Sequence, residues 1–387
     1  MTGANSPATF MARALELARE GAGHTSPNPA VGAIVVRDDR IVGEGRHEGP
    51  GTPHAEAAAL EAAGEAARGA TLYVTLEPCC HQGRTPPCTD AIVRAGVAEV
   101  RFSHLDPDEQ VAGKGRAKLE AADIRVAVGE GEAEARRINE AYLKHRTSGL
   151  PFVIAKFACS LDGKIAATSG DSRWVSGPQT RAWSHQFRTR IDAIAVGVNT
   201  VLVDDPQLTA RPKNPDGSSR PSDRQPLRVV VDSRGRTPPG AKVLGCAEAG
   251  QGGPRAGVAR TLVATTEASS EGWRQQIEEA GAKVAVLPVL PADEQGRVSL
   301  QSLLELLGKS DVLTLLVEGG GVLLGSFFDQ RLVDKVHAVV APMIIGGEGA
   351  ATAVAGKGAS RMADALRLRE VTVERLGEDL LVMGYTT

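Results

Sequence analysis

The chain has 387 residues, too many for one ordinary hydrophobic core, so two domains are the default expectation. Apolar residues make up 42% and charged residues 24%, as in a soluble globular protein, and the net charge of −3 provides no basic surplus for nucleic acid. No apolar run is long enough to span a membrane, and the first residues lack the features of a signal peptide.

The number and positions of the cysteines indicate whether the protein works in a reducing or an oxidising compartment. Three of the five cysteines cluster at Cys79, Cys80 and Cys88, while Cys159 and Cys246 are isolated. This odd, clustered set favours metal binding in a reducing cytoplasm over a disulfide framework.

The first part of the chain alternates strand and helix patterns, which predicts an α/β domain with a mostly parallel sheet covered on both faces. Ser6 is placed to cap a first helix that ends near Gly21. Strands are expected at 31–36, 41–43, 71–76, 97–104 and 124–128, and helices at 54–67, 88–96, 114–122 and 130–144.

The stretch 54–88 contains the parts of a catalytic zinc site. His54 opens a helix, Glu56 follows two residues later, and Cys79 and Cys88 flank a loop after a strand. Three protein ligands leave the fourth tetrahedral position for water, and a nearby glutamate can move that water's proton, as in zinc nucleobase deaminases. Cys80 is the alternative to Cys79 as ligand; Cys79 is favoured because it directly follows Pro78.

The segment 75–88 resembles the deaminase domain of the RibD family of bifunctional riboflavin biosynthesis proteins. Eight residues, including Gly83-Arg84-Thr85-Pro86-Pro87, separate the two cysteines, where cytidine deaminases usually have two. The resemblance implies a cytidine-deaminase-like α/β/α domain, zinc bound by His54, Cys79 and Cys88, and Glu56 as proton shuttle. It also implies substrate contacts at Asn28, His81 and Arg84, with Arg84 on a ribose phosphate. The family commonly has Asp-Pro-Asn where this chain has Asp106-Pro107-Asp108.

The segment 146–151 breaks the helical pattern and predicts a boundary between domains 1–147 and 148–387. In the second domain, strands are expected at 152–157, 192–197, 227–232, 261–265, 283–287 and 312–317. Helices are expected at 270–280 and 299–308, a turn near Thr200, and surface loops at 212–226 and 245–259.

The second half of the chain contains one clear candidate for a ligand-binding turn. It is a predicted strand followed by Glu318 and three glycines. Free backbone N–H groups before an apolar helix can hold a phosphate, although the run does not match the Rossmann fingerprint. On its own, this run is as consistent with a tight turn as with a phosphate site.

The surrounding motifs, at 160–164, 204–211 and 317–320, resemble the RibD reductase domain, which has a dihydrofolate-reductase-like α/β fold. The resemblance implies NADPH contacts at Cys159, Trp174, Thr200, Asp204, Ser233, Gly320, Gly321, Val322, Leu323, Leu324, Gly325 and Ser326. It implies substrate contacts at Lys156, Ser172, Arg188, Leu208, Arg211 and Glu318. Lys156 and Glu318 are also candidates for proton handling.

The resemblance covers essentially the whole chain and implies a zinc- and NADPH-dependent bifunctional enzyme. The first domain is expected to deaminate 2,5-diamino-6-ribosylamino-4(3H)-pyrimidinone 5′-phosphate hydrolytically. The second is expected to reduce the ribosyl group to a ribityl chain, giving 5-amino-6-ribitylamino-uracil 5′-phosphate. The partner is a small molecule, not nucleic acid or membrane, and family likeness suggests a homo-oligomer.

Two other classes remain open on the residues alone. One is a deaminase of another substrate that carries an unrelated accessory domain; the long cysteine spacer argues against it. The other is a binding module in which the zinc is structural. Glu56 argues against it, because a structural zinc site does not need a carboxylate beside an open coordination position.

Overall fold

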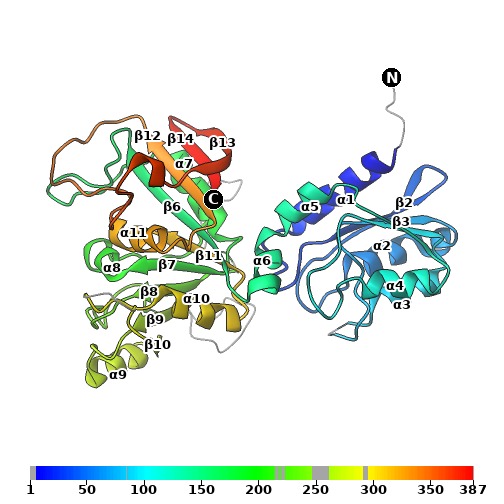
Figure 1. Ribbon diagram of the computed structural model, residues 1–387, viewed down its shortest axis with the longest axis horizontal. Coiled ribbons are helices and arrows are strands. Elements are labelled where there is room, and N and C mark those ends of the chain that lie inside the picture. Colours follow the sequence, from blue (N-terminus) through cyan, green and yellow to red (C-terminus); the bar gives the residue numbers. More distant parts are fainter. Residues whose placement is uncertain are drawn as a thin grey trace. The chain divides into compact units, whose positions relative to one another are not determined.

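The computed structural model describes residues 6–83, 85–213, 218, 222, 224–245, 261–290 and 295–386 (Figure 1). The chain folds into two compact units, Met1–Gly149 and Leu150–Thr387, so the division lies two residues beyond the boundary expected at Thr147. Each unit has its own β-sheet with helices packed against it (Figure 1). Of the helices described, none has the length and apolar character needed to cross a membrane.

The first unit contains a five-stranded sheet in the order β2-β1-β3-β4-β5. Its elements are α1 (Pro7–Gly21), β1 (Gly32–Arg37), β2 (Arg40–Arg46), α2 (Ala55–Ala63), the 3-10 helix η1 (Gly64–Ala67), β3 (Thr71–Val74), α3 (Cys88–Ala95), β4 (Glu99–Phe102), α4 (Lys114–Glu120), β5 (Arg125–Val128), α5 (Glu132–Ile138) and α6 (Glu140–Ser148). The parallel pairing expected from the sequence holds for β3, β4 and β5. β1 is antiparallel to both of its neighbours: to β2 through a tight hairpin, and to β3 on its other side.

Helix α1 begins as the sequence predicts. The Ser6 hydroxyl accepts a hydrogen bond from the Thr9 N–H at 3.3 Å, which satisfies one of the free N–H groups of the first turn. The apolar face of the helix, which includes Phe10, Met11 and Leu15, is buried in the core of the first unit.

Helix α2 packs very closely on β2 because two positions of that strand are glycines. A Cβ atom at Gly45 would lie 2.3 Å from the Ala55 carbonyl oxygen, and one at Gly43 would lie 2.3 Å from the Ala59 carbonyl oxygen. Backbone lies directly against backbone here, so no side-chain rotation can make room. This contact fixes the start of α2, where His54 and Glu56 lie.

The single helix predicted for 130–144 is wrong; the structure has α5 and α6, with Asn139 between them. The Asn139 side chain is buried and binds the backbone of Ala30 twice. Its Oδ1 accepts from the Ala30 N–H at 2.8 Å, and its Nδ2 donates to the Ala30 carbonyl at 2.9 Å. An asparagine that satisfies a distant backbone segment in this way interrupts the helix.

The second unit contains a nine-stranded sheet in the order β10-β9-β8-β7-β11-β6-β12-β14-β13. Its elements are β6 (Phe152–Ser160), α7 (Pro178–Arg188), β7 (Ala193–Gly197), α8 (Val198–Asp204), β8 (Leu227–Val231), β9 (Thr261–Thr265), α9 (Glu271–Glu279), β10 (Lys283–Val286), α10 (Leu300–Lys309), β11 (Thr314–Glu318), α11 (Gly321–Asp329), β12 (Lys335–Ala341), the 3-10 helix η2 (Met362–Asp364), β13 (Leu368–Leu376) and β14 (Asp379–Thr386). The strands from β10 to β12 are parallel, and β14 and β13 extend the sheet antiparallel.

The sequence pattern misses several elements of the second unit. The residues expected as a turn near Thr200 form helix α8. The pattern predicts no element for α7, β12, β13 or β14. All nine β13 positions are exposed or half-exposed, so the strand has no clear apolar alternation. Most of the loop expected at 245–259 lies outside the described residues.

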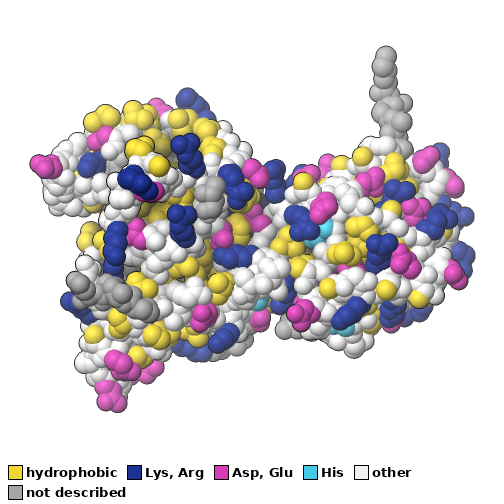
Figure 2. Space-filling view, in the orientation of Figure 1, with side chains coloured by type: hydrophobic (Ala, Val, Ile, Leu, Met, Phe, Trp, Pro, Cys, Tyr) yellow, Lys and Arg dark blue, Asp and Glu magenta, His cyan; other side chains and the backbone are white. Residues whose placement is uncertain are grey.

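The face shown in Figure 2 carries basic and acidic side chains interspersed over each unit. This mixed distribution agrees with the small net charge of −3. A nucleic-acid-binding surface would be expected to gather its basic side chains into a patch or stripe.

We predict that Gly45→Ala will destabilise the first unit by about 1–3 kcal/mol, because the new methyl group overlaps the α2 backbone. Denaturant unfolding of the whole chain measures the change. Gly272→Ala in α9 is the matched control, since its Cβ would meet no neighbour within 4 Å. Equal unfolding midpoints for the two variants would contradict the close-packing argument.

Candidate active sites

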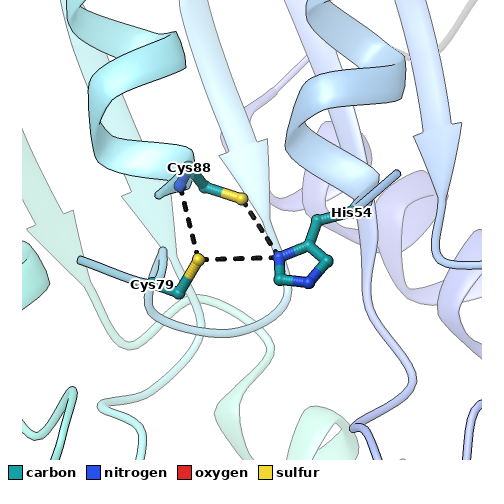
Figure 3. A group of neighbouring side chains, drawn as sticks. All are labelled: His54, Cys79 and Cys88. Carbon is teal, nitrogen blue, oxygen red and sulfur yellow. Dashed lines mark hydrogen bonds between the residues drawn. The ribbon is translucent and has the colours of Figure 1, made fainter. Parts of the chain in front are cut away.

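The side chains of His54, Cys79 and Cys88 converge in the first unit (Figure 3). One nitrogen and two sulfur atoms lie within 4.8 Å of one another, so a single ion can reach all three. Imidazole and thiolate donors suit zinc, and three ligands leave a position for a water molecule. The donor set therefore fits a catalytic zinc ion.

Two of these ligands lie at helix starts and the third in the loop after β3. His54 immediately precedes α2, and Cys88 is the first residue of α3. The Cys88 N–H donates to the Cys79 sulfur at 3.3 Å. Hydrogen bonding from Cys88 and His54, against the effect of burial, lowers the pKa of Cys79 to about 4. The site thus favours the thiolate form that binds metal.

The ring of His54 is oriented by Thr85, a residue of the eight-residue spacer. His54 Nδ1 lies 3.2 Å from the Cys88 sulfur and 3.5 Å from the Cys79 sulfur, while Nε2 lies 3.2 Å from the Thr85 hydroxyl. Nδ1 is therefore the ligand atom, and an Nε2–H donated to Thr85 holds the matching tautomer. Thr85 is not among the site residues expected from the sequence, although its place in the spacer was a signal.

Glu56 is buried beside the ligands, in the first turn of α2. Burial, with a further contribution from the charge on Cys79, raises the pKa of Glu56 to about 7. A carboxyl group whose pKa is near neutrality can both accept and return a proton, which is the requirement for a general acid and base.

A second buried glutamate, Glu77, fixes the loops around Cys79. Its two carboxylate oxygens accept hydrogen bonds from the backbone N–H groups of Asp106 at 3.2 Å, Gly113 at 2.9 Å and Arg116 at 2.9 Å. Each bond to the charged carboxylate is stronger than a neutral one. Glu77 therefore ties the segment 106–116 to the strand end that leads into the metal loop.

Asn28, one of the expected substrate residues, is held by His47. The His47 Nδ1 lies 3.1 Å from the Pro53 carbonyl, which can only accept, so this nitrogen carries the proton. Burial lowers the pKa of His47 and favours its neutral form. Its Nε2, 3.0 Å away, then accepts from the Asn28 amide nitrogen, and Asn28 Oδ1 remains as the acceptor. Sequence reasoning missed His47, since its partners are distant in the chain.

The remaining residues expected in the deaminase site differ in their surroundings. His81 Nδ1 is buried and has no hydrogen-bond partner among the described residues, whereas Arg84 lies outside them. The Asp108 carboxylate, at the position where the family commonly has asparagine, accepts from the Gln110 N–H at 3.0 Å and lies 3.5 Å from Arg146. Cys80 is not part of the ligand cluster; its thiol points to the Gln110 carbonyl at 3.6 Å.

A cavity of about 1470 Å³ lies within the second unit, over the ends of its parallel strands. Sixteen of the residues expected from the sequence line it: Lys156, Ser172, Trp174, Arg188, Thr200, Asp204, Leu208, Arg211, Ser233, Glu318, Gly320, Gly321, Val322, Leu323, Leu324 and Ser326. Cys159 and Gly325 are not among the described residues that line it. Cys159 is buried in β6, and a Cβ at Gly325 would meet the Ala355 carbonyl at 2.0 Å, so this glycine serves packing.

One part of the cavity is built around Glu318, the last residue of β11. Glu318 pairs in register with Lys156 on β6, so both side chains lie on the same face of the sheet. Its carboxylate lies 3.5 Å from Lys156 Nζ and 2.5 Å from an Arg188 guanidinium nitrogen. Burial alone would raise the pKa of Glu318, but Arg188 and Lys156 together lower it to about 2. This carboxylate stays ionised at neutral pH.

His185 also lines this part of the cavity, one helical turn before Arg188. Its Nδ1 accepts from the Arg211 backbone N–H at 3.3 Å. Burial and the nearby charges of Arg188 and Arg211 lower the pKa of His185 to about 4, so the ring is neutral. His185 is not among the site residues expected from the sequence; its spacing from Arg188 was the available signal.

The glycine run that follows Glu318 also lines the cavity. Gly319 and Gly320 have φ angles of +77° and +80°, which L side chains rarely adopt, and they turn the chain from β11 into α11. Ideal Cβ atoms at both positions would lie 3.3 Å from the Thr200 side chain. The start of α11 therefore faces the first turn of α8, and its free N–H groups suit a phosphate.

Comparison with known proteins gives matches to each unit. Residues 4–104 match the family model of the cytidine and deoxycytidylate deaminase zinc-binding region, and residues 151–382 match the model of the RibD C-terminal domain. The second match alone covers more than half of the chain.

Similar proteins span the full length. The riboflavin biosynthesis protein RibD of Aquifex aeolicus is 40% identical over 96% of each chain. The structure of Acinetobacter baumannii RibD (form 1) has a TM-score of 0.84 and 35% identity, covering 98% of each chain. A Thermotoga maritima structure, described as a diaminohydroxyphosphoribosylaminopyrimidine deaminase/5-amino-6-(5-phosphoribosylamino)uracil reductase, has a TM-score of 0.80, 35% identity and the same coverage.

We predict that the purified chain binds zinc and that Cys79→Ser will lose it, because a hydroxyl at this position is a poor substitute for a thiolate ligand. Cys80→Ser is the matched control and is expected to keep its zinc, since this thiol lies outside the cluster. Elemental analysis after dialysis measures both. Zinc loss in Cys80→Ser with retention in Cys79→Ser would reverse the ligand assignment.

We further predict that Thr85→Val will weaken zinc binding by about 10-fold to 100-fold, because the His54 ring loses its orienting hydrogen bond. Competition with a chelator of known affinity measures the change. Thr85→Ser keeps the hydroxyl and is expected to bind zinc as the unchanged protein does. If the valine and serine variants bind alike, Thr85 does not orient His54.

Proposed function

The chain belongs to the RibD family of riboflavin biosynthesis proteins and is a bifunctional deaminase and reductase, for which we propose the following substrates and residue roles. The first unit deaminates 2,5-diamino-6-ribosylamino-4(3H)-pyrimidinone 5′-phosphate. The second reduces the ribosyl group of the product to give 5-amino-6-ribitylamino-uracil 5′-phosphate. The two functional domains are proposed as 1–147 and 148–387, within two residues of the division between the compact units. The observation that carries the proposal is the combination, in one chain, of a three-ligand cluster beside buried Glu56 and a separate large cavity.

His54, Cys79 and Cys88 would hold the zinc ion of the deaminase. When bound, zinc acts as a Lewis acid that makes a water molecule acidic near neutral pH. Glu56 takes the proton from that water and passes protons to the ring nitrogen and to the departing ammonia. Its burial and its raised pKa support this role, since a fully ionised, solvated carboxylate would return a proton poorly.

The substrate of the deaminase is positioned by Asn28, His81 and Arg84. Because His47 takes the amide N–H of Asn28, Asn28 Oδ1 faces the substrate and accepts from an N–H group of the pyrimidine. The unpartnered Nδ1 of His81 gains a hydrogen-bond partner when the substrate binds. Arg84 pairs with the ribose phosphate, for which a guanidinium fork is suited.

NADPH is the cofactor of the reductase, and it supplies the hydride when bound. The start of α11, with Thr200 opposite, takes the diphosphate. Trp174, Asp204 and Ser233 line the same cavity and contact the remainder of the cofactor.

The reductase substrate lies against the charged cluster of the cavity. Lys156 and Glu318 touch the ribosyl group, and Lys156 handles its proton, while Arg188 and Arg211 pair with its phosphate. Ser172 and Leu208 complete this wall of the cavity. The permanent ionisation of Glu318 supports a role in holding Lys156 and Arg188 in place.

The two activities are tested together by supplying the diaminopyrimidine phosphate and following ammonia release and NADPH oxidation. We predict that Glu56→Gln lowers ammonia release by about 100-fold to 10,000-fold, because the site loses its general base and acid. Its zinc content is expected to stay unchanged, and so is NADPH oxidation with the deaminated intermediate. Unchanged ammonia release by this variant would exclude the proton-transfer role, and no NADPH oxidation by the unchanged protein would exclude the reductase assignment.

A further inference from the structure

Three polar side chains form a row across neighbouring strands of the second unit. Glu318 on β11, Lys156 on β6 and His337 on β12 are paired in register, with Lys156 in the middle. Residues paired in this way on parallel strands project from the same face of the sheet. Lys156 therefore has a carboxylate as its neighbour on one side and an imidazole on the other. Glu318 and Lys156 line the cavity, whereas His337 is not among the described residues that do.

The imidazole of His337 is buried without a polar partner. The residue is 4% exposed, and neither ring nitrogen has a hydrogen-bond partner among the described residues. Buried polar atoms are nearly always hydrogen-bonded, so an exception of this kind requires an explanation. An aliphatic side chain would fill the same space without leaving polar atoms unpaired. Packing by itself therefore does not account for a histidine at this position.

Helix α7 holds the His337 ring in place. The rings of Trp183 and Phe187 stack on each other at a centroid distance of 5.3 Å. Their centroids lie 5.7 Å and 5.0 Å from the centroid of the His337 ring. Arg188, the residue after Phe187, donates to the Glu318 carboxylate at 2.5 Å. One helix thus contacts both ends of the row and fixes the imidazole relative to the carboxylate.

The His337 ring is neutral near pH 7. Burial, with further contributions from the charges of Lys335 and Lys156, lowers the pKa of His337 to about 3. A neutral imidazole has one N–H donor and one bare nitrogen that accepts a hydrogen bond. His337 therefore offers an acceptor to a neighbouring cation without adding a charge of its own.

Two cations influence this ring, and one of them is already engaged elsewhere. The Lys335 ammonium donates to the Tyr385 hydroxyl at 3.0 Å and lies 4.5 Å from the centroid of the Tyr385 ring. On β14, the register partner of His337 is Met383, which has no N–H or O–H group in its side chain. Lys156, the neighbour on β6, is the cation that remains to pair with the bare nitrogen.

The Lys156 ammonium has donors to spare. It has three N–H groups, and its Nζ lies 3.5 Å from Glu318 Oε1, which is longer than a well-formed N–H···O hydrogen bond. Arg188 lies closer to the same carboxylate, at 2.5 Å from Oε2. Arg188 thus holds Glu318 more firmly than Lys156 does, and a second acceptor beside Lys156 would fix the direction of its ammonium.

We propose that His337 is a positioning residue for Lys156: its bare nitrogen accepts a hydrogen bond from the ammonium when the reductase substrate binds. The inference rests on the proposed reductase and adds to it a residue behind the cavity wall. Reduction by NADPH adds one hydride and one proton to the substrate, and in the proposed reductase Lys156 handles that proton. An ammonium held between Glu318 and His337 keeps its third N–H for the ribosyl group, in a fixed direction.

Steady-state kinetics of NADPH oxidation by the full chain, with the deaminated intermediate as substrate, tests the proposal. His337→Leu and His337→Phe remove both ring nitrogens, and the phenylalanine keeps a ring against Trp183 and Phe187. Each is expected to lower kcat by about 10-fold to 100-fold and to change KM by less than about 3-fold. The solvent deuterium isotope effect on kcat is expected to rise, because proton delivery becomes slower relative to the other steps.

The controls separate positioning from packing. Met383→Leu changes the packing on the other side of His337 without removing an N–H or O–H group, and its kcat is expected to be unchanged. His337→Gln keeps an acceptor oxygen, so its kcat is expected to lie between those of the unchanged protein and His337→Leu. Calorimetric binding of NADP⁺ is expected to stay within about 3-fold in every variant, which shows that the second unit is folded.

The comparison is made on whichever of the leucine and phenylalanine variants binds NADP⁺. A kcat equal to that of Met383→Leu would overturn the inference and leave the proposed reductase in place. A lowered kcat with an unchanged solvent isotope effect, or no recovery in His337→Gln, would also overturn it, because either result indicates a packing defect. No NADPH oxidation by the unchanged protein would instead remove the proposed reductase, and the inference with it.

Discussion

Both candidate sites depend on the first turn of a helix, where backbone N–H groups have no partner within the helix. In the first unit, the Cys88 N–H at the start of α3 donates to the Cys79 sulfur and favours its thiolate. In the second, the glycine run at the start of α11 faces Thr200 across the cavity. The same property of the backbone thus stabilises a metal ligand in one unit and offers a phosphate site in the other.

Two buried glutamates show how the surroundings of a carboxyl group set its role. At Glu56, burial and the charge on Cys79 outweigh the opposing effect of His54, and the pKa of Glu56 rises to about 7. Glu318 is equally buried, but Arg188 and Lys156 lie against it and its pKa falls to about 2. The first can exchange a proton at neutral pH, whereas the second acts as a fixed charge that organises two cations.

Much of the fold follows from local patterns. The Ser6 cap, the apolar strands and the alternation of strands with helices predict most elements of the first unit, and the spacing of His54, Cys79 and Cys88 predicts the metal cluster. The elements that the sequence pattern predicted wrongly, or not at all, depend on tertiary contacts or on exposure. Asn139 divides a helix because it satisfies the backbone of Ala30, and β13 is a poorly patterned strand because most of its side chains are exposed.

The sequence by itself determined the chemical groups and the order in which they occur, because ligand type, glycine content and periodicity are local properties. Only the tertiary structure decided which atoms face one another. Thr85 holds His54, His47 orients Asn28, and Glu318 meets Lys156 through strand register across more than half of the second unit's sequence. Such pairings join residues that the chain itself keeps far apart, so a pattern read along one strand or helix contains no signal for them.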